Sequence, residues 1–477
     1  MKENRKLQTI DGYLTTAYLL CLFAYLFSQI ITEFHRTVWI TIALYLMLGI
    51  GVIAGICKLI RWREYIHSKY GIVVILLLVS YLFSILMNYR YAFSINIKHW
   101  IILTLAIIIA YFYAGIENIN KNIYLGIRIL ISVMNVCVII SIIQLLMGHG
   151  KIEFYEYYHM KSGFIENRLW GVFIDPNHGS VLSVIVCYLC IYTIEKSNTV
   201  LKKLYYGFTI IIQMMYIAFS DSRTAQVCIA VSMTVYVLGI GLKKIRKKKF
   251  INKCLVIVAS CSIGVCCALL PKVIQTGYNT IIDVANLERK VNIEVCGEVQ
   301  ENVIEQIESS EGRIIKRTYD LEEDVSNQRF DIWKSGIEIF CKSPIYGVTL
   351  FGAREFAKKY VPNTYILRDK VYFSQFHNEV LDVAVAQGII GLAIFVLMAI
   401  LFIVYIIKNF VKEEQNYMAY LTGITVLLCI CVKMMFQQGV MYMYNPDVEI
   451  FWMTLSYLVA NIHMAEKNNN KKSYMSE

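Results

Sequence analysis

Residues 388–407, GIIGLAIFVLMAILFIVYII, are twenty consecutive residues without a charge. A bilayer core about 30 Å thick needs about 20 apolar residues in a helix, so this stretch predicts a membrane-spanning helix. Read with the same window, the chain contains about twelve such runs, each apolar around its whole circumference. They begin near Tyr13, Val38, Tyr70, Trp100, Ile123, Gly179, Leu204, Thr224, Ile251, Gly388, Tyr417 and Asp447. The sequence therefore predicts an all-α polytopic membrane protein with about twelve transmembrane helices.

The composition agrees with this prediction. Of the 477 residues, 57% are hydrophobic and 17% are charged, whereas an ordinary soluble domain has roughly 25% charged residues. Such a chain has too little polar surface to cover soluble domains. Most of the fourteen cysteines lie inside apolar runs, where they act as small hydrophobic residues. Cys296 and Cys341 lie in a polar segment, and their sequence positions leave a disulfide between them open.

The net charge of +11 would suggest nucleic acid in a soluble protein, but here the positions of the charges indicate membrane topology. If the amino terminus is inside, the inner segments hold 23 Lys and Arg residues and the short outer loops hold 7. We therefore expect both termini to be cytoplasmic, with the first helix retained. The basic run at 243–249 is compatible with nucleic acid or anionic lipid, but a topology signal explains it better, and we expect no nucleic-acid partner.

Three regions follow from this topology. Residues 1–270 hold transmembrane helices one to nine, 271–378 form a large extracytoplasmic loop, and 379–477 hold helices ten to twelve with a cytoplasmic tail. Within the loop, 283–324 has twelve acidic and five basic residues, whereas 325–377 has eight basic and four acidic residues together with several aromatics. The second half predicts a folded, partly helical cap. The acidic run 320–324 offers little to a core, and we interpret it as solvated and not as a metal site.

The candidate site consists of polar residues in or beside predicted spans, where contact with lipid is unfavourable. Arg223 stands at the outer start of the eighth span, and Lys433 lies in the eleventh span near its outer end. A lysine that is unpaired at bilayer depth raises the free energy of membrane insertion by about 2.5–3.5 kcal/mol. Snorkelling to the outer interface is the alternative explanation for both side chains.

Further candidates stand at the same predicted face. They are Asn177 in Asp175-Pro176-Asn177-His178, the loop arginines Arg329, Arg354 and Arg368, and the group His377, Asn378 and Glu379 ahead of the tenth span. The alternative for Asn177 is a helix cap. Because Arg presents a planar fork of donors, Arg223 with Arg329, Arg354 or Arg368 could clamp a dianionic group. His377 could take a proton from a hydroxyl group.

These residues also carry a resemblance. The sequence resembles the O-antigen ligase and polymerase family of bacterial membrane glycosyltransferases over about residues 164–407. The matching pieces, in chain order, are Asp175-Pro176-Asn177, Ser220-Asp221-Ser222-Arg223 with Thr224-Ala225, Arg329 and Trp333 ahead of Ser343-Pro344-Ile345-Tyr346-Gly347, and His377-Asn378 followed by Gly388 and Gly391. One departure is Val348, where the family often has a second glycine.

The resemblance implies an enzyme of the bacterial cytoplasmic membrane that uses a polyprenyl-diphosphate-linked oligosaccharide as glycan donor, with no cofactor and no metal. In that reading Arg223 binds the diphosphate, assisted by Arg329 or another loop arginine. His377 orients or deprotonates the acceptor hydroxyl, and Asn378 and Glu379 support the histidine or the sugar.

Three functions remain open. The first is a polysaccharide polymerase for capsule or exopolysaccharide, with a growing glycan acceptor, the lipid bilayer, a flippase and a chain-length regulator as partners. A ligase that moves finished glycan onto a lipid or wall acceptor is the second. The third is a flippase or transporter for lipid-linked glycans, which the one-sided group around His377 disfavours.

Overall fold

A computed structural model describes residues 2–35, 37–113, 115–155, 158–245, 249–284, 291–296, 315, 328–368, 375–410, 416–442 and 445–476. Twelve helices of 17 residues or more lie within this part of the chain, one for each predicted span. They are α1 (Lys2–Ile30), α2 (Val38–Ile60), α4 (Gly71–Met87), α5 (Phe93–Tyr111), α6 (Ile116–Met147), α7 (Pro176–Lys196), α8 (Val200–Ser220), α9 (Arg223–Lys244), α10 (Phe250–Val284), α15 (Glu379–Phe410), α16 (Tyr417–Met434) and α17 (Pro446–Ser476). A short helix, α3 (Trp62–Tyr65), follows α2. The all-α polytopic membrane fold is confirmed.

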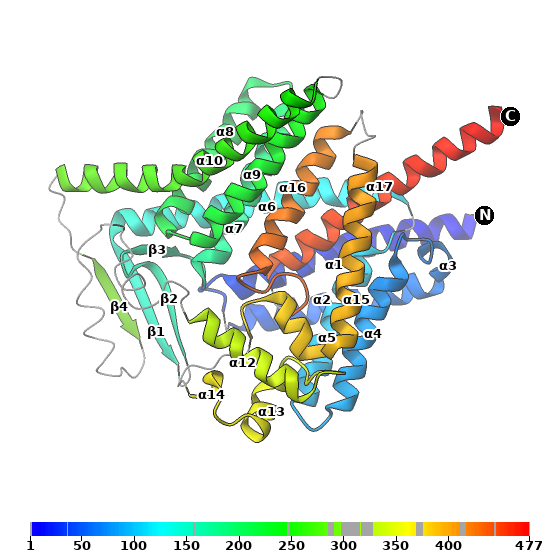
Figure 1. Ribbon diagram of the computed structural model, residues 1–477, viewed down its shortest axis with the longest axis horizontal. Coiled ribbons are helices and arrows are strands. Elements are labelled where there is room, and N and C mark those ends of the chain that lie inside the picture. The colour runs from blue at the N-terminus through cyan, green and yellow to red at the C-terminus, as the bar shows by residue number, and fades with distance from the viewer. Residues whose placement is uncertain are drawn as a thin grey trace.

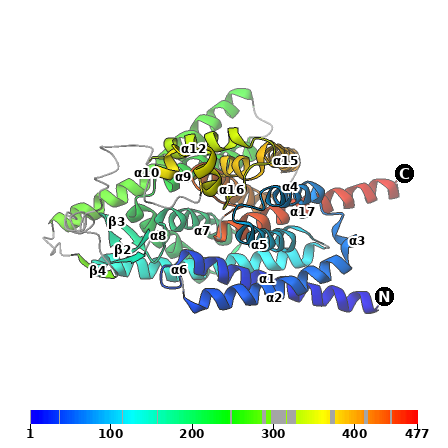
Figure 2. The same cartoon turned by 90° about the horizontal axis from the view of Figure 1, so that it is seen from below.

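Nine of these helices are long and apolar enough to cross a membrane, as judged over the described residues. The other three are α4, which is apolar but only 17 residues long, α8 and α17. Lys202 and Lys203 lie in the first turn of α8, and Asp447 and Glu449 lie in that of α17, which lowers the hydropathy of both helices. The two ends of the chain lie on one side of the bundle in both views (Figures 1 and 2).

A four-stranded sheet at one end of the bundle is absent from the sequence prediction. Its strands are β1 (His149–Tyr155), β2 (Tyr158–Ile165), β3 (Arg168–Gly171) and β4 (Asn292–Cys296), in the order β3-β2-β1-β4. β1 pairs antiparallel with β2 and parallel with β4, so the sheet joins the segment before α7 to the segment after α10. The Cys296 thiol on β4 and the Cys341 thiol are both free and exposed.

The described residues between α10 and α15 include three short helices with a small apolar core of their own, which we call the cap. It consists of α12 (Arg329–Lys342), α13 (Ala353–Tyr360) and α14 (Tyr365–Arg368), which pack around a buried cluster separate from the main core of the bundle. Figure 1 shows these helices together at the edge of the bundle, away from both termini. α10 continues through Pro271 to Val284, beyond the expected start of the loop. Residues 320–324, with 246–248 of the basic run, lie outside the described residues.

The cap is joined to a break in α15. Gly388 has φ 67° and ψ −163°, and Gly347 has φ 71°, so both adopt conformations that favour glycine. A Cβ on Gly388 would lie 2.3 Å from the Ile345 carbonyl oxygen, and one on Gly347 would lie 2.5 Å from that of Val385. The Val348 amide donates to the Val385 carbonyl at 2.8 Å. One glycine therefore suffices for this turn, and valine at position 348 does not loosen it.

Candidate functional site

Several helix ends meet at the candidate site, because polar residues stop or start the helices there. Asp175 caps α7 by accepting the Asn177 amide at 2.8 Å, and Pro176 occupies the first helical position. Ser222 caps α9 by accepting the Ala225 amide at 3.3 Å. Asn378 accepts the Leu381 amide at 3.1 Å in the first turn of α15. The amino ends of helices attract anions because their first N–H groups lack intrahelical partners.

Asn177 links two of these helices. Its Oδ1 accepts a hydrogen bond from the Ser222 hydroxyl at 2.7 Å, while Asp175, and not Asn177, supplies the cap of α7. The capping explanation for Asn177 is therefore wrong. Since Arg223 follows Ser222 as the first residue of α9 and is half-buried, the link places its backbone beside the start of α7.

A lysine that sequence reasoning did not select lies on the other side of this turn. Lys272 on α10 pairs with Asp221 at 2.5 Å, and about half of its side chain is exposed. Asp221 directly precedes Ser222 and has φ 47°. The ion pair ties α10 to the turn that leads into Arg223.

His377 is half-buried and lies in a charged environment. Burial and the nearby Arg329 guanidinium lower the pKa of His377 to about 4, against a smaller opposing effect of Asp175. Arg329 opens α12, and its guanidinium carbon lies 5.6 Å from the centre of the Phe436 ring. The imidazole of His377 is therefore neutral at neutral pH and able to accept a proton, with a cation beside it.

Asn378 and Glu379 hold the chain between α16 and α17. The Asn378 side-chain amide donates to the Met435 carbonyl at 3.3 Å. Glu379 is fully buried, and its carboxylate accepts the amides of Gly439 at 2.8 Å and Met441 at 2.7 Å. These bonds fix residues 435–441 against the start of α15, so Asn378 and Glu379 support the backbone around His377.

Lys433 does not snorkel. Its side chain is 0% exposed and forms an ion pair with Asp447 at the start of α17. The Lys433 ammonium also lies 2.6 Å from Nδ1 of His178. The snorkelling explanation for Lys433 is wrong, because a partner on the neighbouring helix compensates the charge inside the bundle.

Arg354 and Arg368 contact the cap itself. The Arg354 guanidinium donates to the Ile366 carbonyl at 2.6 Å, which joins α13 to α14. Arg368 is exposed and donates to the Asn363 carbonyl at 2.9 Å. Among the four arginines predicted from the sequence, Arg329 is the one that influences His377 directly.

Sequence reasoning missed Gln437, His178 and Asp447 as members of the site. Gln437 donates to Asp175 at 2.7 Å. The available signal was the polar content of the short link between the last two spans, which has Gln437, Gln438, Asn445 and Asp447 within eleven residues. Within the described part of the chain, no cluster of three or more His, Cys, Asp or Glu residues is arranged to hold a metal ion.

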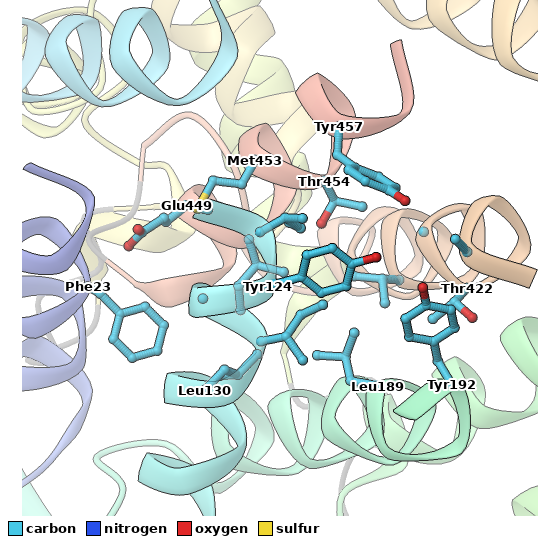
Figure 3. A pocket seen from close by; sticks show the side chains of 17 residues that line it. Phe23, Tyr124, Leu130, Leu189, Tyr192, Thr422, Glu449, Met453, Thr454 and Tyr457 are labelled. Atoms are coloured by element: carbon cyan, nitrogen blue, oxygen red, sulfur yellow. The ribbon is translucent and has the colours of Figure 1, made fainter. Parts of the chain in front are cut away.

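A separate cavity of about 70 Å³ lies between α1, α6, α7, α16 and α17 (Figure 3). It is lined by Leu189 and Tyr192, about 20 Å along α7 from the candidate site at 1.5 Å per residue. Glu449, which is 3% exposed, stands at one end of it, and its Oε2 has no hydrogen-bond partner among the described residues.

We expect Glu449→Met to raise the melting temperature of the detergent-solubilised protein by several degrees. The substitution removes a buried polar group whose desolvation costs about 1–3 kcal/mol when it is unsatisfied, and methionine fills a similar volume. The matched control is Asp447→Leu two residues earlier, which should lower the melting temperature because it leaves Lys433 unpaired. A lower melting temperature for Glu449→Met would contradict the prediction.

Part of the chain is similar to known proteins. Residues 208–396, about two fifths of the chain, match the family model described as O-antigen ligase. The matched segment includes Arg223, Arg329 and His377. A Haemophilus influenzae protein described as uncharacterized is 31% identical over 81 residues, which is 17% of this chain and 20% of that protein. The chain thus matches about a fifth of that relative's length.

Proposed function

We propose that this O-antigen ligase/polymerase-like membrane enzyme is a polysaccharide polymerase that joins polyprenyl-diphosphate-linked repeat units on the outer face of the cytoplasmic membrane. The observation that supports the proposal is a neutral, half-buried His377 beside Arg329 and close to Asp175, at the start of α7, where Asn177 also bonds to Ser222, the residue before Arg223. A base for a hydroxyl and cations for a leaving diphosphate are the two requirements of glycosyl transfer from such a donor.

In the proposed reaction, an acceptor sugar hydroxyl attacks the anomeric carbon that is bonded to the diphosphate. The new bond forms between the acceptor oxygen and that carbon, while the bond from the carbon to the diphosphate oxygen breaks and its electron pair stays on the diphosphate. Arg223 and Arg329 stabilise the negative charge that develops on the leaving group. His377 takes the acceptor hydroxyl proton, and the polyprenyl diphosphate leaves within the membrane.

A direct test uses purified protein in detergent with a polyprenyl-diphosphate-linked repeat unit. We expect longer glycans together with released polyprenyl diphosphate. No release by folded wild-type protein would contradict glycosyl transfer. A second candidate, a ligase, shares the same chemistry and differs in its acceptor, so a finished glycan transferred to a lipid acceptor in preference to a repeat unit would favour it. Movement of intact donor across a vesicle membrane without bond cleavage would favour a flippase.

The pH profile offers an independent prediction. Because the pKa of His377 is lowered to about 4, the base is deprotonated above that pH. We therefore expect kcat/KM, which reports the free enzyme, to be flat on the acid side near neutrality and to fall only as the pH drops through about 4. Arg329→Gln removes one cause of the lowered pKa, so its acid limb should move upward. A wild-type limb near pH 6.5, the value for an unperturbed histidine, would contradict this assignment.

A further inference from the structure

Asp175 and His178 form a polar pair that faces the candidate site. Nε2 of His178 lies 3.8 Å from Oδ2 of Asp175, which is too far for a hydrogen bond. The Asp175 side chain is 34% exposed and that of His178 is 6% exposed. Asp175 is therefore the more accessible of the two side chains.

Asp175 is fixed and ionised. Its Oδ1 accepts the Asn177 amide at 2.8 Å, and its Oδ2 accepts the Gln437 side-chain amide at 2.7 Å. Although burial opposes the shift, the Asn177 amide, Arg168 and Lys433 hold the pKa of Asp175 below its usual range. The second lone pair of Oδ2 can accept one further hydrogen bond.

The tautomer of His178 is set by Lys433. Nδ1 of His178 faces the Lys433 ammonium at 2.6 Å and the side-chain amide of Asn445 at 3.5 Å. An ammonium group has donors only, so Nδ1 must accept and the ring proton must be on Nε2. Asp447 pairs with Lys433 and holds it in place. Nε2–H donates no hydrogen bond within the described residues, and Nε2 lies 3.8 Å from Oδ2 of Asp175.

We propose that Asp175 and His178 together bind one hydroxyl group of the acceptor sugar, with Lys433 and Asp447 as positioning residues that keep Nε2 of His178 a donor. The proposal rests on the proposed function and names the acceptor subsite of that reaction. A sugar hydroxyl donates one hydrogen bond and accepts others. One oxygen placed about 2.8 Å from both atoms would donate to Asp175 and accept from His178.

The position of the pair favours the acceptor over the diphosphate. Asp175 lies close enough to influence the charge state of His377, the proposed base for the acceptor hydroxyl. Asn177, between the two residues of the pair along the chain, links instead to the turn that precedes Arg223. An ionised Asp175 repels phosphate but accepts from a neutral hydroxyl, so the subsite discriminates against an anionic group at this position.

The first test measures binding of the free oligosaccharide repeat unit, cut from the polysaccharide of the source organism, to purified protein by titration calorimetry. We expect Asp175→Asn and His178→Phe each to weaken binding about tenfold to a hundredfold. His178→Gln should lose less affinity, because its amide N–H can replace Nε2–H. Lys433→Met should weaken oligosaccharide binding about tenfold. Lys58 is another buried lysine beside an aspartate (Asp11, at 4.0 Å), and Lys58→Met should bind like wild type.

The second test reads the tautomer without using activity. The protein has eight histidines, and His178→Gln identifies the nitrogen-15 signals of His178 in a histidine-labelled sample. We expect the proton on Nε2 in the wild type and a move toward Nδ1 in Lys433→Met, where Asp447 Oδ2 lies 3.9 Å from Nδ1. A wild-type proton on Nδ1 would overturn the proposal.

The two tests separate this inference from the proposed function. Wild-type oligosaccharide affinity in both His178→Phe and Asp175→Asn would overturn the subsite while transfer by the enzyme remained. If His178→Phe does not fold, the comparison of His178→Gln with wild type and the tautomer measurement decide the question. If the folded wild-type protein transfers no glycan but the affinities of the variants change as expected, the polymerase reaction is overturned and the sugar subsite remains.

Discussion

Arg223→Ala is expected to reduce glycan transfer by about a thousandfold or more without loss of folded protein. Arginines that stabilise a transferring or leaving phosphate group contribute about 10³–10⁵ to turnover in phosphoryl-transfer enzymes. Arg223 occupies the first position of α9, where the helix end itself favours an anion. The measurement is release of polyprenyl diphosphate from a lipid-linked donor by the purified variant.

Two variants show whether the loss concerns diphosphate recognition. Arg223→Lys retains a positive charge but not the planar fork of donors, so it should recover part of the activity. Arg90→Ala removes an exposed arginine of the loop between α4 and α5, and it should behave like wild type. Full activity of Arg223→Ala would remove the diphosphate role from this residue and would shift it to Arg329 or Lys272.

The helices of this protein could be predicted from the sequence because lipid makes the pattern simple. Each spanning helix must satisfy its backbone groups internally and expose apolar side chains all round, so runs such as residues 388–407 are unambiguous. The sheet could not be predicted in this way. β1 and β4 are short segments about 140 residues apart that pair only in the folded chain, and β4 has almost no buried side chains to create an alternating pattern.

The outline of the candidate site could be read from the sequence, whereas the contacts between its residues could not. Helix starts at Asp175, Ser222 and Asn378 can be read from their capping residues, and their shared face follows from alternating topology. The partner of a buried charge cannot be read in this way. Lys433 has the same sequence signature whether it snorkels or pairs, and only the packing of α16 against α17 brings Asp447 to it.

Packing also explains why His178 was not recognised. In the sequence it follows Asp175-Pro176-Asn177 as an ordinary residue in the first turn of a helix. Its chemical significance arises from Lys433, which lies 255 residues later and contacts its Nδ1. Residues that act through such long-range contacts leave no local sequence pattern. Gly347 and Gly388 differ, because a backbone with positive φ favours glycine and the residue type itself is the signal.

His377→Asn is expected to lower turnover by about a hundredfold to ten-thousandfold, the usual contribution of a positioned general base, while donor binding is largely kept. Asparagine is the informative replacement because His377 has φ 53°, and asparagine tolerates this left-handed conformation better than most residues. The loss can then be attributed to the missing base and not to backbone strain. Donor affinity and single-turnover rate, measured on the same preparation, distinguish the two contributions.

The assignment of His377 as the base depends on that distinction. If donor affinity falls and the single-turnover rate at saturating donor is kept, His377 binds the donor and is not the base. His159 is an exposed histidine on β2, so His159→Asn serves as the control and should retain wild-type kinetics.

Because the bound diphosphate would offset the charge of Arg329, it should raise the pKa of His377 from about 4. The base would therefore be strongest when the donor is in place, which couples proton removal from the acceptor to the presence of a leaving group.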